Sequence, residues 1–263
     1  MLNPAPVQRT PQLAPVTLSI ELLAHLRRRR ACDPDSAPAW RDALVELRGQ
    51  LHQLDLALVR TDAERRAFWI NLHNALILDG VTQMGITNSV REAPGFYRLV
   101  AYQVGSECFS ADAIEHAILR ANRPPFGHGP PVLPHADVRL RHSLATVDPR
   151  IHFALHCATV SCPSISAYDA LQIEDQLDWA AAAFINGGAV TWDVSDRSAC
   201  LSPLFDTYRQ DFGDTDALAA LLRRYLIQSR EADLIVEALG VGRVHYGQFD
   251  WSLPPEEETD AGA

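Results

Sequence analysis

The sequence predicts an α+β fold: a helix-rich single domain with a small, mostly antiparallel sheet. Three observations lead to this prediction. Leucines spaced by three or four residues recur through the first 84 residues, which is typical of amphipathic helices. Short strand-like segments bounded by Gly or Pro occur only later in the chain. Hydrophobic residues make up 47% of the 263 residues, enough for a sizeable core without disulfides or metals.

Composition divides the chain into three parts. The prolines of residues 1–16 predict a flexible, extended lead-in. Residues 17–253 are expected to form the single α+β domain, and they contain no internal repeat. Residues 254–263 are rich in Glu and Asp and predict a disordered acidic tail.

Three helices are expected in the N-terminal third. The first is marked by Leu18, Leu22, Leu23 and Leu26, and the second by Trp40, Leu44, Leu47, Leu51, Leu54 and Leu58. The third begins with Thr61 and Glu64, which have the spacing of a capping box. Its segment 66–80 is apolar on nearly every side, so this helix should be buried.

The rest of the chain alternates short strands with helices. The expected elements are a hairpin around Gly105, a short helix over 113–121, an irregular Pro/Gly-rich loop over 123–134, a strand over 151–157, a long helix ending at 186–188, a strand over 189–194, a helix starting at Ser202 and ending at Gly213, helices near 216–228 and 230–239, and a last strand over 243–246.

Charge and targeting signals narrow the partners. The formal net charge is −10 with a pI of about 5.4, which argues against nucleic acid or an anionic membrane as the main partner. No apolar run of about 18 residues and no signal peptide is visible, so a cytoplasmic location is expected. No Walker A, GxGxxG, HExxH or GxSxG motif occurs, so no cofactor is expected.

Five scattered cysteines predict mostly free thiols rather than a disulfide scaffold. Cys157 would lie where the strand over 151–157 meets a turn, a common place for a nucleophile. A zinc site from His152, His156, Cys157 and Cys162 is the alternative. A strand, however, would send His156 and Cys157 to opposite faces, so no metal is expected.

Polar residues inside the buried third helix need partners. Asn71, His73, Asn74 and Asp79 either bond neighbouring backbone groups or line a site. In the short helix over 113–121, His116 points nearly opposite the apolar face, so it is either solvated or directed into a cleft. Glu115 flanks that face and is expected to pair with a structural partner such as Arg120 or Arg150.

Five segments resemble, in order, the signature blocks of the domain of unknown function 547 family. The segments are FWINLHNAL (68–76), AIEHAILR (113–120), RIHFALHCATVSCP (150–163), LSPLFDTYRQDFG (201–213) and FDWSL (249–253). The resemblance implies grouping with papain-like cysteine peptidases, and therefore an α+β fold with a thiol at a cleft.

Carried onto this chain, the family blocks point to a set of polar residues. They are Asn71, Asn74, Glu115, His116, Cys157, Ser161, Cys162, Pro163 and Asp211. Relatives often have Tyr where this chain has His73, and His where it has Asp79. If the histidine absent at position 79 were the family's base, this member would be impaired or would use His73. Plant relatives have Ser at the position of Cys162 but keep a cysteine at that of Cys157, which favours Cys157.

The expected function is a thiol-dependent hydrolase or acyl transferase acting on a peptide or a small amide- or thiol-bearing compound. Cys157 would be the nucleophile, His116 the base and Asn74 a polarising or orienting group. The expected binding residues are Asn71, Glu115, Ser161, Cys162 and Asp211. The alternatives are a non-catalytic module that binds a peptide or small ligand, and a redox role in which Cys157 and Cys162 form a disulfide.

Overall fold

The computed structural model describes residues 1–3, 12–31 and 38–254. The helices are α1 (Pro15–Ala31), α2 (Pro38–His52), α3 (Asp62–Gln83), α4 (Phe96–Leu99), α5 (Ile173–Phe184), α6 (Pro203–Thr207), α7 (Arg209–Phe212), α8 (Thr215–Tyr225) and α9 (Arg230–Gly240). The strands are β1 (Ala101–Val104), β2 (Glu107–Ser110), β3 (Val190–Asp193), β4 (Ser198–Leu201) and β5 (Val244–Tyr246).

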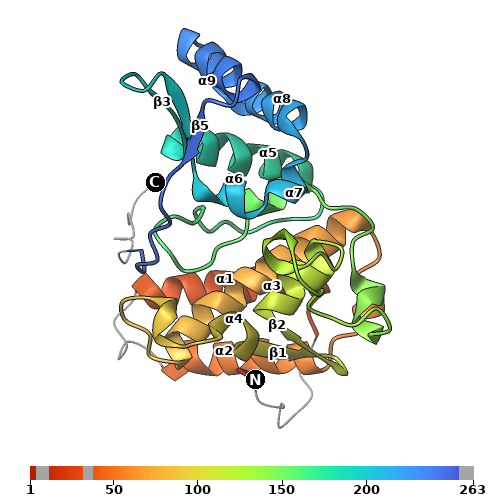
Figure 1. Ribbon diagram of the computed structural model, residues 1–263. Coiled ribbons are helices and arrows are strands. Elements are labelled where there is room, and N and C mark those ends of the chain that lie inside the picture. The colour runs from red at the N-terminus through yellow and green to blue at the C-terminus, as the bar shows by residue number, and fades with distance from the viewer. Residues whose placement is uncertain (4–11, 32–37, 255–263) are drawn as a thin grey trace.

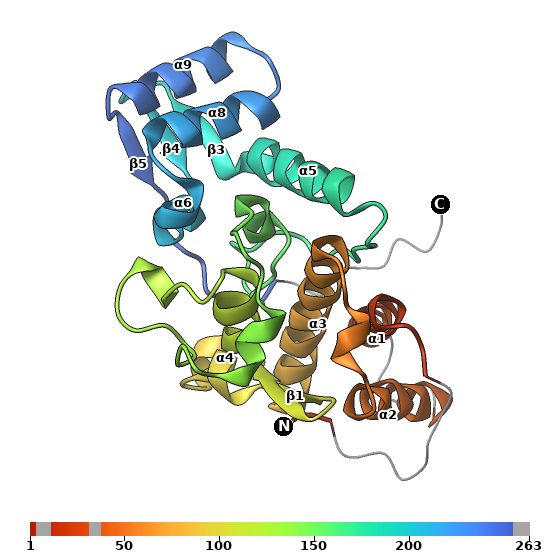
Figure 2. The ribbon, with the colours of Figure 1, turned by 90° about the vertical axis from the view of Figure 1, so that its right-hand side faces the viewer.

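The elements form two groups, one above the other in Figure 1. The lower group holds α1–α4 with the β1–β2 hairpin, and the upper group holds α5–α9 with β3–β5. In Figures 1 and 2, the green segment around residues 149–163 runs between them. The fold is therefore a helix-rich α+β domain with little sheet, mostly antiparallel, as predicted.

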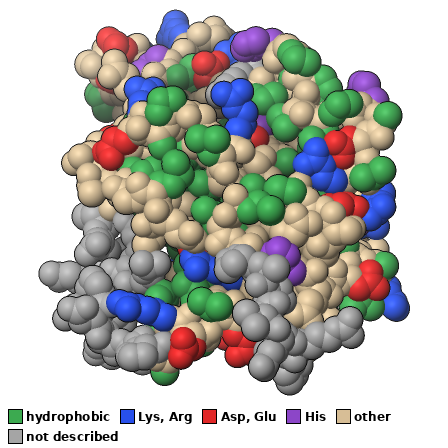
Figure 3. Space-filling view, turned by 90° about the horizontal axis from the view of Figure 1, so that it is seen from below, with side chains coloured by type: hydrophobic (Ala, Val, Ile, Leu, Met, Phe, Trp, Pro, Cys, Tyr) green, Lys and Arg blue, Asp and Glu red, His purple; other side chains and the backbone are tan. Residues whose placement is uncertain are grey.

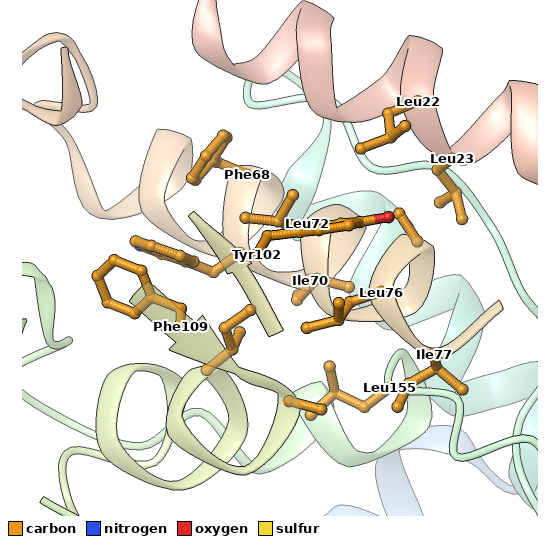
Figure 4. Packing of buried hydrophobic residues seen from close by; sticks show 14 of the residues in the cluster. Leu22, Leu23, Phe68, Ile70, Leu72, Leu76, Ile77, Tyr102, Phe109 and Leu155 are labelled. Carbon is orange, nitrogen blue, oxygen red and sulfur yellow. The ribbon is translucent and has the colours of Figure 1, made fainter. Parts of the chain in front are cut away.

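Helix α3 is the centre of the lower group. Its N-terminus has the predicted capping box, in which Thr61 and Glu64 each accept from the other's backbone N–H. The residues 67–81 are all buried, and α1 packs along α3 through its predicted leucines (Figure 4). A Cβ at Gly80 would lie 2.5 Å from Cγ1 of Val100, so the close approach of the next segment requires glycine.

The predicted hairpin is present. Strands β1 and β2 pair antiparallel, and Gly105 occupies the turn with φ +56. A Cβ at Gly105 would also lie 2.6 Å from the carbonyl oxygen of Leu54, so only glycine fits against the end of α2. The chain start lies beside this hairpin, because Leu2 N–H donates to Ala101 O at 2.8 Å and Asn3 is buried.

The upper group has its own apolar cluster beneath a three-stranded sheet. Strands β3 and β4 pair antiparallel, whereas β4 and β5 pair parallel. Strand β4 was not predicted. The helix predicted from Ser202 to Gly213 is split at Tyr208 into α6 and α7, with Ser202 as its N-cap. Helices α8 and α9 and strands β3 and β5 lie where the sequence predicted them.

The predicted strand over 151–157 is wrong. Residues Pro149–Phe153 form a 3-10 helix, which Asp148 caps by accepting from Arg150 N–H. The chain after it is irregular, and its backbone is satisfied by a side chain instead of a neighbouring strand. Asn74 donates to Ala154 O and accepts from His156 N–H, both at 2.9 Å. An apolar segment alone does not distinguish a strand from such a buried loop.

Surface and terminal features complete the fold. The predicted tail over 254–263 lies almost entirely outside the described residues, because 255–263 are not described, and so does half of the predicted lead-in over 1–16, because 4–11 are not described. The lead-in is shorter than predicted, since α1 already begins at Pro15. No helix among the described residues is long and apolar enough to cross a membrane. On the face shown in Figure 3, acidic and basic side chains of the described residues are interspersed rather than grouped by sign.

Candidate functional site

A cavity of about 550 Å³, here called the histidine cavity, lies among elements of both groups. Its polar lining comes from segments far apart in the sequence. These lining residues are His73, Tyr97, Arg98, Asp112, Glu115, His116, His152, His156, Cys157, Cys162, Thr207 and Tyr208. Prolines of the predicted loop over 123–134 and the aromatic residues Phe249 and Trp251 form part of its wall.

Glu115 and His116 reach the cavity together because of an unusual helix. Residues Ala113–Leu119 form a π-helix, a wider turn than the predicted α-helix. In an α-helix His116 would point away from the apolar face, but here it is buried, beside Glu115. Of the two alternatives for His116, solvated or directed into a cleft, the structure has the second.

Glu115 is the buried anion at the centre of the site. Tyr208 donates its hydroxyl to Glu115 Oε1 at 2.6 Å, while His73 Nε2 and His116 Nδ1 lie 3.8 and 3.7 Å from its oxygens. Burial favours the neutral acid, but His116, His73 and the Tyr208 hydroxyl outweigh it and lower the pKa of Glu115 to about 2. Glu115 is therefore ionised, and its expected pairing with Arg120 or Arg150 is wrong.

His116 presents an N–H to the cavity. Arg120, which has only donors, donates from Nη1 to His116 Nδ1 at 2.9 Å. The neutral ring must then carry its hydrogen on Nε2. Burial and the nearby Arg120 lower the pKa of His116, against the opposing effect of Glu115, so the ring stays neutral. This is the arrangement of a hydrogen-bond donor rather than of the predicted base.

His152 has the opposite arrangement. Its Nε2 lies 2.8 Å from Oδ2 of the ionised Asp211 and so donates, which leaves the Nδ1 lone pair as the acceptor. Tyr208 stacks on the ring with centroids 3.9 Å apart. Burial lowers the pKa of His152 although Asp211 opposes this. A neutral imidazole held by a carboxylate is the geometry of an oriented base.

Asp211 links this base to a buried arginine. Its carboxylate accepts from Arg120 Nε, from Arg123 Nη1 at 2.8 Å and from His152. These hydrogen bonds outweigh burial and hold the pKa of Asp211 well below its usual range. The predicted site residue Asp211 therefore lies behind the cavity wall, where it orients His152 and neutralises Arg120.

His73 leaves one polar atom unsatisfied. Its Nδ1 lies 3.3 Å from Asn74 Oδ1, but the buried Nε2 has no hydrogen-bond partner among the described residues and lies 3.8 Å from Glu115 Oε2. Burial lowers the pKa of His73 despite the nearby Glu115. Buried polar atoms are nearly always paired, so an unpaired ring nitrogen beside an anion indicates a functional position.

The cysteines differ from the sequence-based expectation of mostly free thiols. Cys157 and Cys162 form a disulfide with Cα atoms 6.1 Å apart, and both line the histidine cavity. The Cys162 Sγ accepts from Cys157 N–H at 3.2 Å and from the Thr159 hydroxyl at 3.1 Å. Cys108 and Cys200 are free, and Cys32 lies outside the described residues.

The two predicted asparagines are structural in their contacts. Asn71 donates to Tyr168 O and accepts from Tyr168 N–H, both at 2.8 Å. Asn74 holds residues 154–156 in the same way. Neither lines the histidine cavity, so of the sequence's two alternatives for these residues the structure has bonding to neighbouring backbone. Asn74 positions the segment that carries the candidate site instead of facing a ligand.

Two further positions lie away from this cavity. Asp79 accepts hydrogen bonds from Arg48 and Tyr102 inside the lower group, so a base at position 79 would not face the histidine cavity. Asp79 therefore contributes nothing to the histidine cavity. Ser161 lies on the other side of the Cys162 segment, and its hydroxyl accepts from Asp250 N–H at 2.8 Å.

Sequence reasoning missed two participants. His152 was considered only as a zinc ligand, and Tyr208 was not among the candidate site residues. The available signal was weak: Tyr208 and Asp211 lie three residues apart in the LSPLFDTYRQDFG block. Among the described residues, no group of three or more His, Cys, Asp or Glu has an arrangement that could hold a metal ion.

The comparisons with known proteins gave one family match. Residues 59–185 match the family model described as "Protein of unknown function, DUF547", the family that the sequence blocks resemble. The match includes His73, Glu115, His116, His152 and both bridged cysteines, but ends before Tyr208 and Asp211. A comparison with curated proteins and with solved structures found no match.

Proposed function

We propose that this chain is a thiol-dependent hydrolase or acyl transferase whose substrate, a peptide or a small amide- or thiol-bearing compound, occupies the histidine cavity. One observation carries the proposal. The Cys157–Cys162 pair lines the same cavity as an ionised glutamate and several buried histidines. A cavity of about 550 Å³ between two groups of elements also fits the papain-like cleft that the family resemblance implies.

The attacking group is the thiolate of Cys162. A dithiol reductant first opens the disulfide. The reductant is oxidised to its own disulfide, and Cys157 and Cys162 are each reduced to a thiol. The donors from Cys157 N–H and Thr159 that reach Cys162 Sγ would then stabilise a negative sulfur. Cys157 Sγ lies 3.6 Å from the Thr159 hydroxyl and accepts from no backbone N–H of the described residues, which reverses the preference drawn from the family resemblance.

Two histidines divide the remaining roles. His152 Nδ1, oriented by Asp211, accepts the Cys162 proton and returns it to the leaving amine. His116 Nε2–H donates to the carbonyl oxygen that becomes negative when sulfur attacks. The thioester that forms at Cys162 is then cleaved by water or by an acceptor nucleophile, which regenerates the thiol. These assignments move the base from His116 to His152.

The alternative is a non-catalytic module that binds a peptide or small ligand in the same cavity. The disulfide favours it, because a bridged Cys162 has no nucleophilic thiolate. His73 Nε2, which has no hydrogen-bond partner among the described residues and lies beside Glu115, can bind a ligand without turnover. The two proposals differ in the reactivity of the reduced cysteines.

The deciding experiment measures alkylation by iodoacetamide against pH, with each cysteine resolved by mass spectrometry after reduction by dithiothreitol. Cys162 should react rapidly well below the ordinary thiol pKa of about 8.5, with Cys108 as the internal reference. Thr159→Val and His152→Gln should each slow Cys162 at low pH while leaving Cys108 unchanged. If Cys162 reacts no faster than Cys108 at any pH, the hydrolase proposal is wrong and the binding module replaces it.

A further inference from the structure

A second cavity adjoins the first. It has a volume of about 500 Å³ and is lined by the four serines Ser161, Ser164, Ser166 and Ser202; we call it the serine cavity. Cys162 and Pro163 line both cavities. The chain at these two residues is therefore a partition, with the proposed nucleophile at the junction.

The two cavities differ in charge. No Asp, Glu, Lys, Arg or His is among the described residues that line the serine cavity. The histidine cavity, in contrast, contains Asp112, Glu115 and Arg98 together with its histidines. The C-terminal end of α5 contributes the small residues Ala180 and Ala183 to the serine cavity, and the π-helical turn after it contributes Gly187, which leaves room for ligand atoms. A neutral group is suited to one side and a polar or charged group to the other.

Tyr168 is an independent sign that the serine cavity takes a ligand. It lines this cavity, is 1% exposed, and its buried hydroxyl has no hydrogen-bond partner among the described residues. Burial raises the pKa of Tyr168 above its usual value, so the hydroxyl keeps its proton as a donor. Asn71 fixes the residue by bonding both its backbone N–H and its carbonyl. A buried hydroxyl left unpaired is rare and costly, and a ligand acceptor would satisfy it.

We infer that the serine cavity is a second substrate subsite, which holds an uncharged part of a peptide-like substrate while its polar or charged part lies in the histidine cavity. The amide to be cleaved then crosses the partition at Cys162. This inference rests on the proposed function and names its substrate class: an extended amide with one neutral side and one polar side. A compact substrate confined to the histidine cavity would not need Tyr168 or the α5 end.

The test compares two alkylating reagents on the reduced protein: iodoacetamide and its larger, uncharged relative N-benzyl iodoacetamide. For each cysteine, the rate with N-benzyl iodoacetamide is divided by the rate with iodoacetamide. This ratio at Cys162, divided by the same ratio at Cys108, reports binding next to Cys162. We expect a ratio of at least about ten, because a phenyl ring that enters the cavity leaves water. Ala183 is exposed at the cavity wall, so Ala183→Trp should fill the space and bring the ratio to about one while the iodoacetamide rate stays unchanged.

Two further variants complete the experiment. Asp175→Trp, on the exposed side of α5 and outside both cavities, is the matched control and should keep the ratio. Tyr168→Phe should not lower the thermal unfolding midpoint, because the removed hydroxyl has no partner to lose among the described residues. A ratio that Ala183→Trp leaves unchanged overturns the subsite.

The outcomes separate the two proposals. If Cys162 has ordinary reactivity at low pH but Ala183→Trp still abolishes the N-benzyl advantage, the hydrolase proposal fails and the subsite stands as a binding site. If Cys162 is activated but the ratio is near one in the protein without substitutions, the subsite is wrong and the hydrolase proposal stands. No alkylation of Cys162 by either reagent overturns both.

Discussion

Two buried carboxylates, Asp79 in the lower group of elements and Glu115 in the histidine cavity, differ in how their charge is compensated. Asp79 accepts from Arg48, from the Tyr102 hydroxyl at 2.6 Å and from Gln83 at 3.0 Å, and it lines neither cavity. From the described residues, Glu115 accepts one hydrogen bond, donated by Tyr208, and it otherwise faces two histidines at more than 3.5 Å.

The difference shows how a structural anion can be distinguished from a site. The charge of Asp79 is compensated by a buried arginine and all its donors belong to the protein, so nothing is left for a ligand. Glu115 is compensated only in part and borders open volume. A buried charge has to be paired or hydrogen-bonded, so incomplete pairing beside a cavity indicates a place where a ligand completes it.

The largest expected effect is on the Asp79 pair. Asp79→Asn should lower the free energy of unfolding by about 3–5 kcal/mol, because it leaves the Arg48 charge buried without its partner. Urea unfolding followed by circular dichroism measures this. The control is Asp206→Asn in the exposed pair with Arg209, expected to cost less than about 1 kcal/mol. Equal costs for the two variants would show that the buried Arg48–Asp79 pair does not stabilise the lower group.

A matched pair of tyrosines sharpens the comparison. Tyr208→Phe removes the only direct hydrogen bond that Glu115 accepts among the described residues and should cost about 2 kcal/mol, a typical value for a hydrogen bond to a charged group. Tyr102→Phe leaves Asp79 with Arg48 and Gln83 and should cost about 1 kcal/mol. Tyr208→Phe should also raise the pKa of Glu115 from about 2, measured by carbon NMR of the carboxyl. If Tyr102→Phe proves the more costly change, Glu115 is not the less satisfied anion.

The last comparison concerns a pH slope from the cavity histidines. Burial lowers the pKa of His73, His116 and His152 below 6.5, so the unfolded chain binds protons first and stability falls as pH drops below about 6.5. Each histidine contributes up to about 1.4 kcal/mol per pH unit. The lowered pKa of Glu115 adds a further loss only as pH falls from about 4.5 towards 2.

The variant His73→Phe tests this slope. Between pH 6.5 and 5 its stability should fall less steeply than that of the unmodified protein, by up to about 1.4 kcal/mol per pH unit. Urea unfolding at several pH values measures both slopes. An unchanged slope would mean that His73 takes up a proton in the folded protein as readily as in the unfolded chain, which its burial argues against although Glu115 favours the proton.

Much of the helical framework could be predicted from local signals. The capping box at Thr61 and Glu64, the leucines of α1, and Ser202 before Pro203 marked helices where the structure has them. The strand over 151–157 failed because the apolar content of a short segment reports burial and not hydrogen-bond partners. There the backbone partner is Asn74, which is remote in sequence. The tautomer of His116 could not be predicted either, because Arg120, which contacts its Nδ1, decides which ring nitrogen carries the hydrogen.

The sequence by itself determined the helix-rich α+β class, the central buried helix and some of the polar residues from which the site is built. These follow from interactions within a few residues, such as capping, apolar spacing and turn-forming glycine. Only the tertiary structure decided which of those residues meet. Glu115, His152 and Tyr208 come together from distant segments, and the pKa values of the site depend on the burial and charge that this meeting creates.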